Sequence, residues 1–176
     1  MSPMSSDSRL VEVAGLFMAT VEVRLRELGL SLAEATGPPS GVRISMRMAR
    51  RSGNLLYLSG NGPLRDGQPA YRGKVGREVT LEEAYDAAKL TGLNLLAVIK
   101  AELGDLDRVA AFVKTLGFVN SAPGFTQQPQ VLNGFADLVV DLYGEERGLH
   151  ARSAVGMAEL PFDIPVEIET IVEVAP

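Results

Sequence analysis

The chain has 176 residues, 46% hydrophobic and 22% charged, which is enough to bury the core of one domain. Its formal net charge of −5 disfavours nucleic acid or an anionic membrane as a partner. With no cysteine and one histidine, the sequence excludes disulfides, thiolate catalysis and Cys- or His-rich metal sites. The lack of cysteine fits the reducing cytoplasm, where we place the protein, and no stretch is typical of a membrane span.

The first 41 residues predict a leader followed by a helix. Residues 1–8 are polar, and we expect them to be disordered. Residues 9–28 carry apolar side chains near helical spacing, and Gly29 follows where a left-handed residue ends a helix easily. A loop rich in Gly and Pro leads to residue 41, so residues 9–41 are expected to form an N-terminal helix and loop.

Residues 42–176 predict a single domain that begins with a β-hairpin. Val, Ile and Met alternate with polar residues over 42–50, which indicates a half-buried strand. A Ser-Gly-Asn turn then leads into a partner strand over 55–59. Residues 67–76 are expected to be loop or a short edge strand.

Two long helices and a central strand follow. Thr80 and Glu83 form a capping box that begins a helix ending at Gly104. Residues 109–119 are rich in Val, Phe and Leu and predict a central strand, and residues 128–143 predict a second long helix. With two C-terminal strands, this order predicts an α+β fold: a mixed sheet with two long helices on one face, plus the N-terminal helix.

The C-terminal stretch 150–169 carries the strongest chemical signal, because it predicts two strands joined by a short loop. One face of the first strand would carry a guanidinium and then three small residues: Arg152, Ala154, Gly156 and Ala158. Small residues leave space, and an Arg fork binds both oxygens of a carboxylate. Glu167 and Glu169 on the returning strand would hold a water or a proton nearby.

A second interpretation of the same residues involves no ligand. Arg152 would be a surface side chain in an ion pair with a neighbouring Glu, and the small residues would make room for a packed helix. Asn133 has two interpretations as well, because it either helps to cap the second long helix or faces a ligand. Spacing alone leaves both pairs of alternatives open.

Several common motifs fail on inspection. Gly67 to Lys74 resembles a phosphate-binding loop, but five residues separate Gly67 from Gly73 and Val75 replaces the required Ser or Thr. A Ser-His-Asp triad would have to use the single His150, which is more typical of a structural or solvated residue. The arginines between positions 43 and 51 alternate along one strand face with few aromatics nearby, which disfavours nucleic-acid binding.

Five segments of the sequence resemble the YjgF/Rid family of reactive-intermediate deaminases, also called L-PSP endoribonucleases. The segments are Asn54-Leu55-Leu56-Tyr57-Leu58-Ser59-Gly60-Asn61, Phe118-Val119-Asn120, Ala151-Arg152-Ser153-Ala154-Val155, Leu160-Pro161 and Val166-Glu167-Ile168-Glu169. The resemblance covers roughly residues 42–174. It implies a chorismate-mutase-like fold and a homotrimer with ligand clefts between subunits. It also implies cofactor-free hydrolysis of enamine or imine intermediates, such as 2-aminoacrylate, to a 2-keto acid and ammonia.

The resemblance also implies roles for individual residues. Arg152 matches the arginine that clamps the substrate carboxylate, and Glu167 matches the acidic residue that holds the attacking water. Three further positions, Ala154, Ser59 and Gly60, match the substrate-binding lining, and Asn133 matches a cleft asparagine.

The sequence departs from the family pattern at three positions. Ala154 stands where many members have Cys, Ser or Thr, Pro39 where many have Tyr, and Asn61 where Gln is usual. The altered lining leaves one alternative to a deaminase, a non-catalytic trimer that binds a small carboxylate. The second name of the family leaves another, an endoribonuclease.

Overall fold

The computed structural model of the protein describes residues 20–35 and 45–176. The predicted leader 1–8, the first part of the predicted N-terminal helix and Pro39 lie outside these residues. No helix in the described part of the chain is long and apolar enough to span a membrane.

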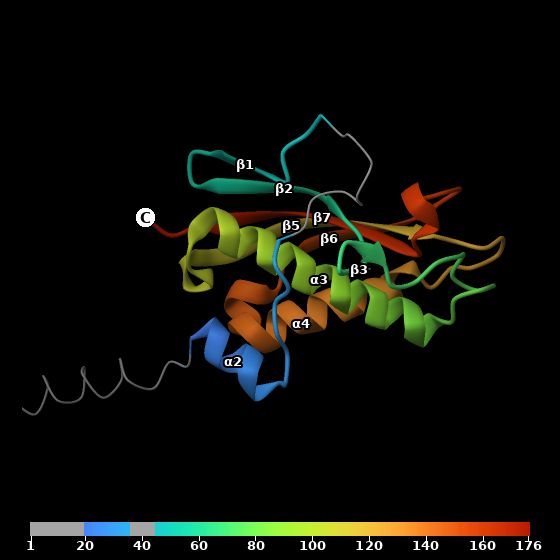
Figure 1. The fold of residues 1–176 in the computed structure, drawn as a ribbon, viewed down its shortest axis with the longest axis horizontal. Helices are drawn as coiled ribbons and strands as arrows, with labels where there is room; N and C mark the ends of the chain where they lie inside the picture. The colour runs from blue at the N-terminus through green and yellow to red at the C-terminus, as the bar shows by residue number, and fades with distance from the viewer. Residues whose placement is uncertain (1–19, 36–44) are drawn as a thin grey trace, which may run out of the picture.

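Five strands form one mixed sheet in the order β1-β2-β7-β5-β6, which confirms the predicted α+β fold (Figure 1). Strands β5 and β6 run parallel, and the other neighbouring pairs are antiparallel. The strands are β1 (Ala49–Ser52), β2 (Leu55–Asn61), β5 (Val109–Asn120), β6 (Ala151–Met157) and β7 (Val166–Val174). A separate small hairpin joins β3 (Leu64–Arg65) to β4 (Gln68–Pro69).

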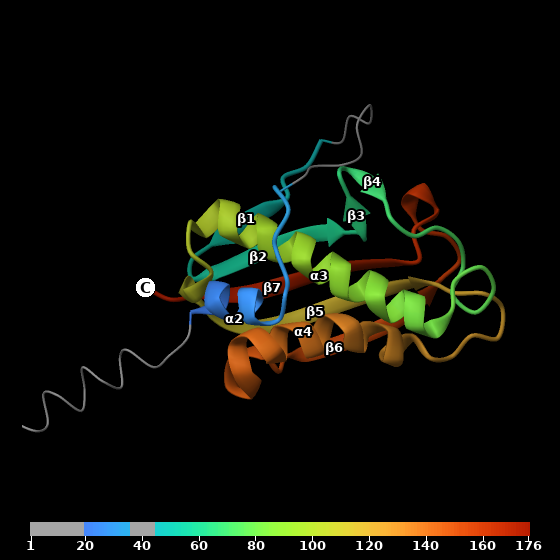
Figure 2. The ribbon, with the colours of Figure 1, turned by 60° about the horizontal axis from the view of Figure 1, so that its bottom comes forward.

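Helices α3 (Leu81–Leu103) and α4 (Gln128–Gly148) pack side by side on one face of the sheet (Figure 2). The predicted capping box is present, because Glu83 N donates to Thr80 Oγ1 at 3.1 Å and Thr80 N donates to Glu83 Oε2 at 2.9 Å. The two helices approach closely at Gly134, where an added Cβ would lie 2.0 Å from the carbonyl oxygen of Tyr85. A glycine is therefore required at this crossing.

The helix α2 (Val21–Glu27) packs at one end of α3 and α4. Glu22 pairs with Lys100 of α3 at 2.7 Å, and Arg24 Nη1 donates to the carbonyl of Leu142 in α4 at 2.8 Å. Gly29 has φ +67°, as its predicted place after the end of this helix requires.

Two expectations about the strands were wrong. Residues 45–48 of the predicted strand are not in a strand. Strand β1 starts at Ala49, which is the first residue to pair with β2, opposite Leu58. The two C-terminal strands do not pair with each other, because β5 lies between them and bonds to β6 on one side and β7 on the other. The loop between them, which includes the 3₁₀ turn η2 (Pro161–Asp163), therefore spans the end of β5.

The sheet buries one face and exposes the other. Along β7, Val166, Ile168 and Thr170 face the helices and are at most 1% exposed, whereas the residues between them face away. No helix of the described residues covers that other face, which we call the open face (Figure 1). Among its apolar side chains, Tyr57, Val155 and Met157 are 36–42% exposed.

His150 lies in an aromatic cluster just before β6. Its ring meets Phe135 edge-on, with the centroids 5.5 Å apart, and its Nδ1 lies 2.7 Å from the carbonyl oxygen of Gly148. Because Nδ1 carries the proton in this hydrogen bond, Nε2 is left as a buried acceptor without a partner among residues 20–35 and 45–176. Burial lowers the pKa of His150 below 6.5, and the nearby charges of Arg152 and Lys114 lower it further.

We predict that His150 makes the protein less stable in acid. Because its pKa is lower in the folded than in the unfolded chain, stability should fall as the pH drops below 6.5, by up to about 1.4 kcal/mol per pH unit. Urea unfolding of the wild type and of His150→Phe at pH 7.5 and 5.5 tests this, and the variant should lose less stability. Since the chain has one histidine, its NMR titration gives a direct control, and a midpoint at or above 6.5 would contradict the prediction.

Candidate functional site

Arg152 belongs to β6, an edge strand that lies beside helix α4 (Figure 2). Its Nη1 donates to Asn133 Oδ1 at 3.0 Å, and its Nη2 donates to the carbonyl of Pro129 at 3.3 Å. These bonds use two of the five N–H donors of the guanidinium. Within the described residues no carboxylate lies within ion-pair distance of Arg152, so the ion pair that the second interpretation expected is not formed there.

The small residues on this face of β6 accommodate the helix layer. Ala154 packs against the hydrophobic core, and a Cβ added to Gly156 would lie 3.0 Å from the side chains of both Gln128 and Ser121. The neighbouring Gly117 of β5 is needed for the same reason, because an added Cβ would lie 2.2 Å from the side chain of Leu132. Within one chain, the space that these residues leave is therefore filled by α4 and by Ser121, which precedes it.

The Arg152 guanidinium is fixed on one side and available on the other. Partial burial lowers the pKa of Arg152, and the charge of Asp137 on α4 opposes that change. A guanidinium keeps its charge under any ordinary condition. A charged fork held by two neutral acceptors at a sheet edge is well suited to bind a carboxylate from outside.

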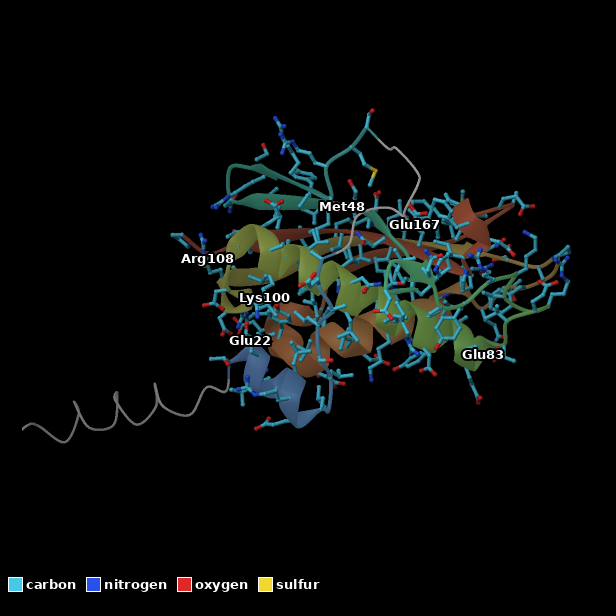
Figure 3. The ribbon with its side chains drawn as sticks, viewed as in Figure 1. Glu22, Met48, Glu83, Lys100, Arg108 and Glu167 are labelled. Atoms are coloured by element: carbon cyan, nitrogen blue, oxygen red, sulfur yellow. The ribbon has the colours of Figure 1, made fainter. Side chains whose placement is uncertain are left out.

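Glu167 lies on the open face of the sheet (Figure 3). Across the strands it is level with Phe118 of β5, which in turn is level with Val155 of β6, so its neighbours on that side are apolar. Its carboxylate lies against Gly60, where an added Cβ would be 2.0 Å from Glu167 Oε1. Burial raises the pKa of Glu167, and repulsion from Glu169 raises it further.

Arg152 and Glu167 are on opposite faces of the sheet. Arg152 is level with Thr115 of β5, whose side chain is fully buried under the helices, whereas Glu167 is level with the open-face residue Phe118. The strand pattern predicted Glu167 near Arg152, but within one chain the two side chains do not meet. The reason is the register along β5, where Thr115 and Phe118 are an odd number of positions apart and therefore face opposite sides of the sheet.

The structure groups the expected site residues in two places. Asn133 joins Arg152 on the helix side. Ser59 and Gly60 join Glu167 on the open face, where Ser59 lines a hollow of about 330 Å³ together with Tyr57, Lys114 and Glu169. The side chain of Asn61 is buried and donates to the carbonyl of Ser59 at 3.0 Å, so it braces this strand.

A second hollow, of about 430 Å³, lies between α3 and α4 and is lined by Asn133, Tyr85 and Asp137, among others. Tyr85 OH donates to Asp137 Oδ2 at 2.8 Å, and burial and this bond raise the pKa of Tyr85 to about 12. Sequence reasoning missed this pair and the role of the Pro129 carbonyl. No local pattern signals either, because each depends on where α4 crosses another element.

A mixed sheet covered on one side by two helices, with a guanidinium at one edge and a sheltered carboxylate on the open face, places this chain among the small α+β proteins. The sequence profile described as "YjgF/chorismate mutase-like, putative endoribonuclease" matches residues 22–167. The chain belongs to this family.

Individual relatives agree with the family assignment. "Protein TCP17" from Trypanosoma cruzi is 41% identical over 153 residues, which cover 87% of this chain and 93% of that protein. The solved structure of Atu1372 from Agrobacterium tumefaciens, a protein of unknown function, is 42% identical, with a TM-score of 0.79 over 89% of this chain and 93% of that one. A protein from Shewanella oneidensis described as a putative endoribonuclease has a TM-score of 0.81 and 28% identity, over 88% and 99% of the two chains.

A more distant structure shares the fold alone. TdcF from E. coli, crystallised with bound serine, has 21% identity and a TM-score of 0.56, over 82% of this chain and 99% of that one.

We predict that Gly60→Ala displaces the Glu167 carboxylate with little loss of stability. The obstacle to the new methyl is the end of a flexible side chain, which can swing away toward water. The pKa of Glu167 should then fall toward its ordinary value of 4.5, because the burial that raises it is reduced. Carboxyl NMR titration measures this change. The matched control is Gly62→Ala, whose methyl would meet Ile164 instead; an equal change in both variants would contradict the prediction.

Proposed function

We propose that the protein is a cofactor-independent deaminase that hydrolyses imine or enamine intermediates of amino-acid metabolism. The substrate class is a 2-imino acid or its enamine, such as 2-aminoacrylate, and the products are a 2-keto acid and ammonia. The active site is a cleft between the subunits of a homotrimer. The cytoplasmic location stays a prediction.

The observation that carries this proposal is the state of Arg152. Its guanidinium is held by Asn133 and the Pro129 carbonyl, has no ion-pair partner among the described residues, and lies at a free sheet edge. A fixed cation of this kind binds a small carboxylate without first breaking an ion pair. That the same fold holds serine in TdcF supports a small carboxylate as the ligand.

A second subunit brings the two groups together. Arg152 and Glu167 cannot meet through the sheet of one chain, but the edge of one subunit can approach the open face of another. The partly exposed Tyr57, Val155 and Met157 give that face the apolar character of an interface between copies. In this arrangement Arg152 and Asn133 of one subunit face Ser59, Gly60 and Glu167 of the next.

Hydrolysis of an imine requires two things of the protein, a fixed substrate and a group that exchanges protons. Water adds to the electrophilic imine carbon: a C–O bond forms as the C=N double bond becomes single, and one proton of the water passes to the nitrogen. The hydroxyl proton of the resulting amino alcohol also passes to the nitrogen, the C–N bond breaks and ammonia leaves as the C=O bond forms. An enamine first takes a proton on carbon to become the imine. Arg152 holds the carboxylate in place, while Glu167 orients the water, takes a proton from it and returns a proton to the leaving nitrogen. The raised pKa of Glu167 suits this exchange, because a base that is easily protonated also serves as an acid.

A carboxylate-binding protein without turnover is the second candidate. It is favoured by Ala154, which packs into the core and offers no side-chain polar atom to a substrate. This candidate requires ligand-dependent thermal stabilisation that disappears in Arg152→Ala, with no ammonia released. The family description also names an endoribonuclease, but burial lowers the pKa of His150, which disfavours an acid role for it.

We expect Arg152→Ala to abolish ammonia release from imino acids generated in situ by an amino-acid oxidase.

Glu167→Gln should lower kcat by roughly 10²-fold or more, with a smaller effect on KM, because it removes the proton exchange and leaves the carboxylate clamp intact. The rate of the wild type should rise with pH as Glu167 ionises, through a midpoint above 4.5, and Glu167→Gln should lack this limb. Lys100→Met, at the α2 contact, is the control. Unchanged release in Arg152→Ala would refute the assignment.

We expect a solution mass near 56 kDa, three times the 18.8 kDa of the chain. Val155→Glu should shift the protein toward monomers, because it places a charge in the apolar part of the open face. Leu149→Glu is the control. It adds the same charge at an exposed leucine (63% exposed) that lies before β6 and outside the open face. Light scattering after gel filtration measures all three proteins. A monomeric wild type, or an intact trimer in Val155→Glu, would contradict the proposed interface.

A further inference from the structure

Lys74 belongs to the segment that resembles a phosphate-binding loop, but it points into the protein. Its side chain is only 15% exposed. The ammonium group donates to Asn120 Oδ1 at 2.7 Å, to the carbonyl of Ala158 and, at 3.3 Å, to Glu159 Oε2. Its three N–H donors therefore match acceptors at the end of β5 and just after β6.

The acceptors show that this contact is more than a surface ion pair. The Glu159 side chain is 78% exposed, so its charge is well solvated and contributes little. The two shorter contacts are with neutral oxygens, one of them on the fully buried Asn120. Burying an ammonium is costly, and here its hydrogen bonds offset that cost only while the three acceptors keep their positions.

The segment around Lys74 holds the loop that joins β6 to β7. Gly73 N donates to the carbonyl of Asp163 at 2.8 Å, and Arg72 Nη1 donates to the carbonyl of Phe162 at 2.6 Å. Phe162 and Asp163 have φ of +59° and +58°, a conformation that non-glycine residues adopt only when their surroundings impose it. These bonds supply that constraint.

Asn120 connects the Lys74 contact to the start of β7. Its side chain accepts from Lys74 and donates from Nδ2 to Asp163 Oδ1 at 3.4 Å. Its backbone N donates to the carbonyl of Pro165 at 2.9 Å, two residues before Glu167. A displacement of Lys74 would thus pass through Asn120 to the backbone that carries Glu167.

We infer that Lys74 is a positioning residue that, with Asn120, fixes the β6–β7 loop and thereby keeps the Glu167 carboxylate against Gly60. The inference rests on the proposed function only for the consequence that Glu167 then acts on a substrate. The position of Glu167 itself is measured without turnover.

The test is Lys74→Met, which keeps the length of the side chain and removes its ammonium. Carboxyl NMR titration should show the pKa of Glu167 falling toward 4.5 as the loop loosens and water reaches the group. In ammonia release, kcat should fall by about tenfold or more while KM stays within about threefold, because misplacing a reacting group affects the chemical step more than binding at Arg152. Lys100→Met makes the same substitution in an ion pair remote from the loop and should change neither quantity.

A second variant keeps the inference testable if Lys74→Met does not fold. Asp163→Gly removes the acceptor of Asn120 Nδ2 and suits the positive φ at that position, so it should fold and shift the Glu167 titration in the same direction. An unchanged titration in folded Lys74→Met, or in Asp163→Gly, overturns the inference. Absence of turnover in the wild type overturns the proposed function instead, and the titrations still decide the role of Lys74.

Discussion

The arrangement of this protein depends on the position of β5 between β6 and β7. As the central partner of both strands, β5 buries its Val- and Phe-rich sequence and separates two segments that are neighbours in the chain. The register along β5 puts Arg152 level with the buried Thr115 and Glu167 level with Phe118, which face opposite sides of the sheet. Arg152 consequently faces the helix layer at the sheet edge, and Glu167 faces the open side.

Arg152 and Glu167 have different environments. Arg152 is held by neutral oxygens from α4, so its charge is oriented without being neutralised. Glu167 lies among apolar side chains and next to a glycine, so its charge is disfavoured and its pKa is raised. A fixed cation suits binding, and an easily protonated carboxylate suits proton exchange. Their separation within one chain makes assembly a condition of activity in the proposed mechanism.

Glycines and polar contacts hold the elements that position the two charged groups. Gly134 lets α3 and α4 approach closely, and Gly117 leaves room for Leu132 of α4 beneath β5. These contacts fix α4, which in turn supplies both acceptors of Arg152. On the other side of the sheet, the Lys74 and Asn120 contacts fix the loop that precedes Glu167. Each charged group is thus held by a support that is distant in sequence.

The sequence by itself determined the α+β class, the boundaries of α3 and β5 and the end of α2, because capping boxes, terminal glycines and hydrophobic periodicity are local signals. It also singled out Arg152 and Glu167, first through the guanidinium and small residues on one strand face and then through a family resemblance. It did not determine strand order, so it paired β6 with β7 and placed both charges at one point. Only the tertiary structure decided which face each strand presents, that α4 fills the space beside Ala154, and that Lys74 is turned inward. These outcomes depend on contacts between residues far apart in the chain, which no local pattern encodes.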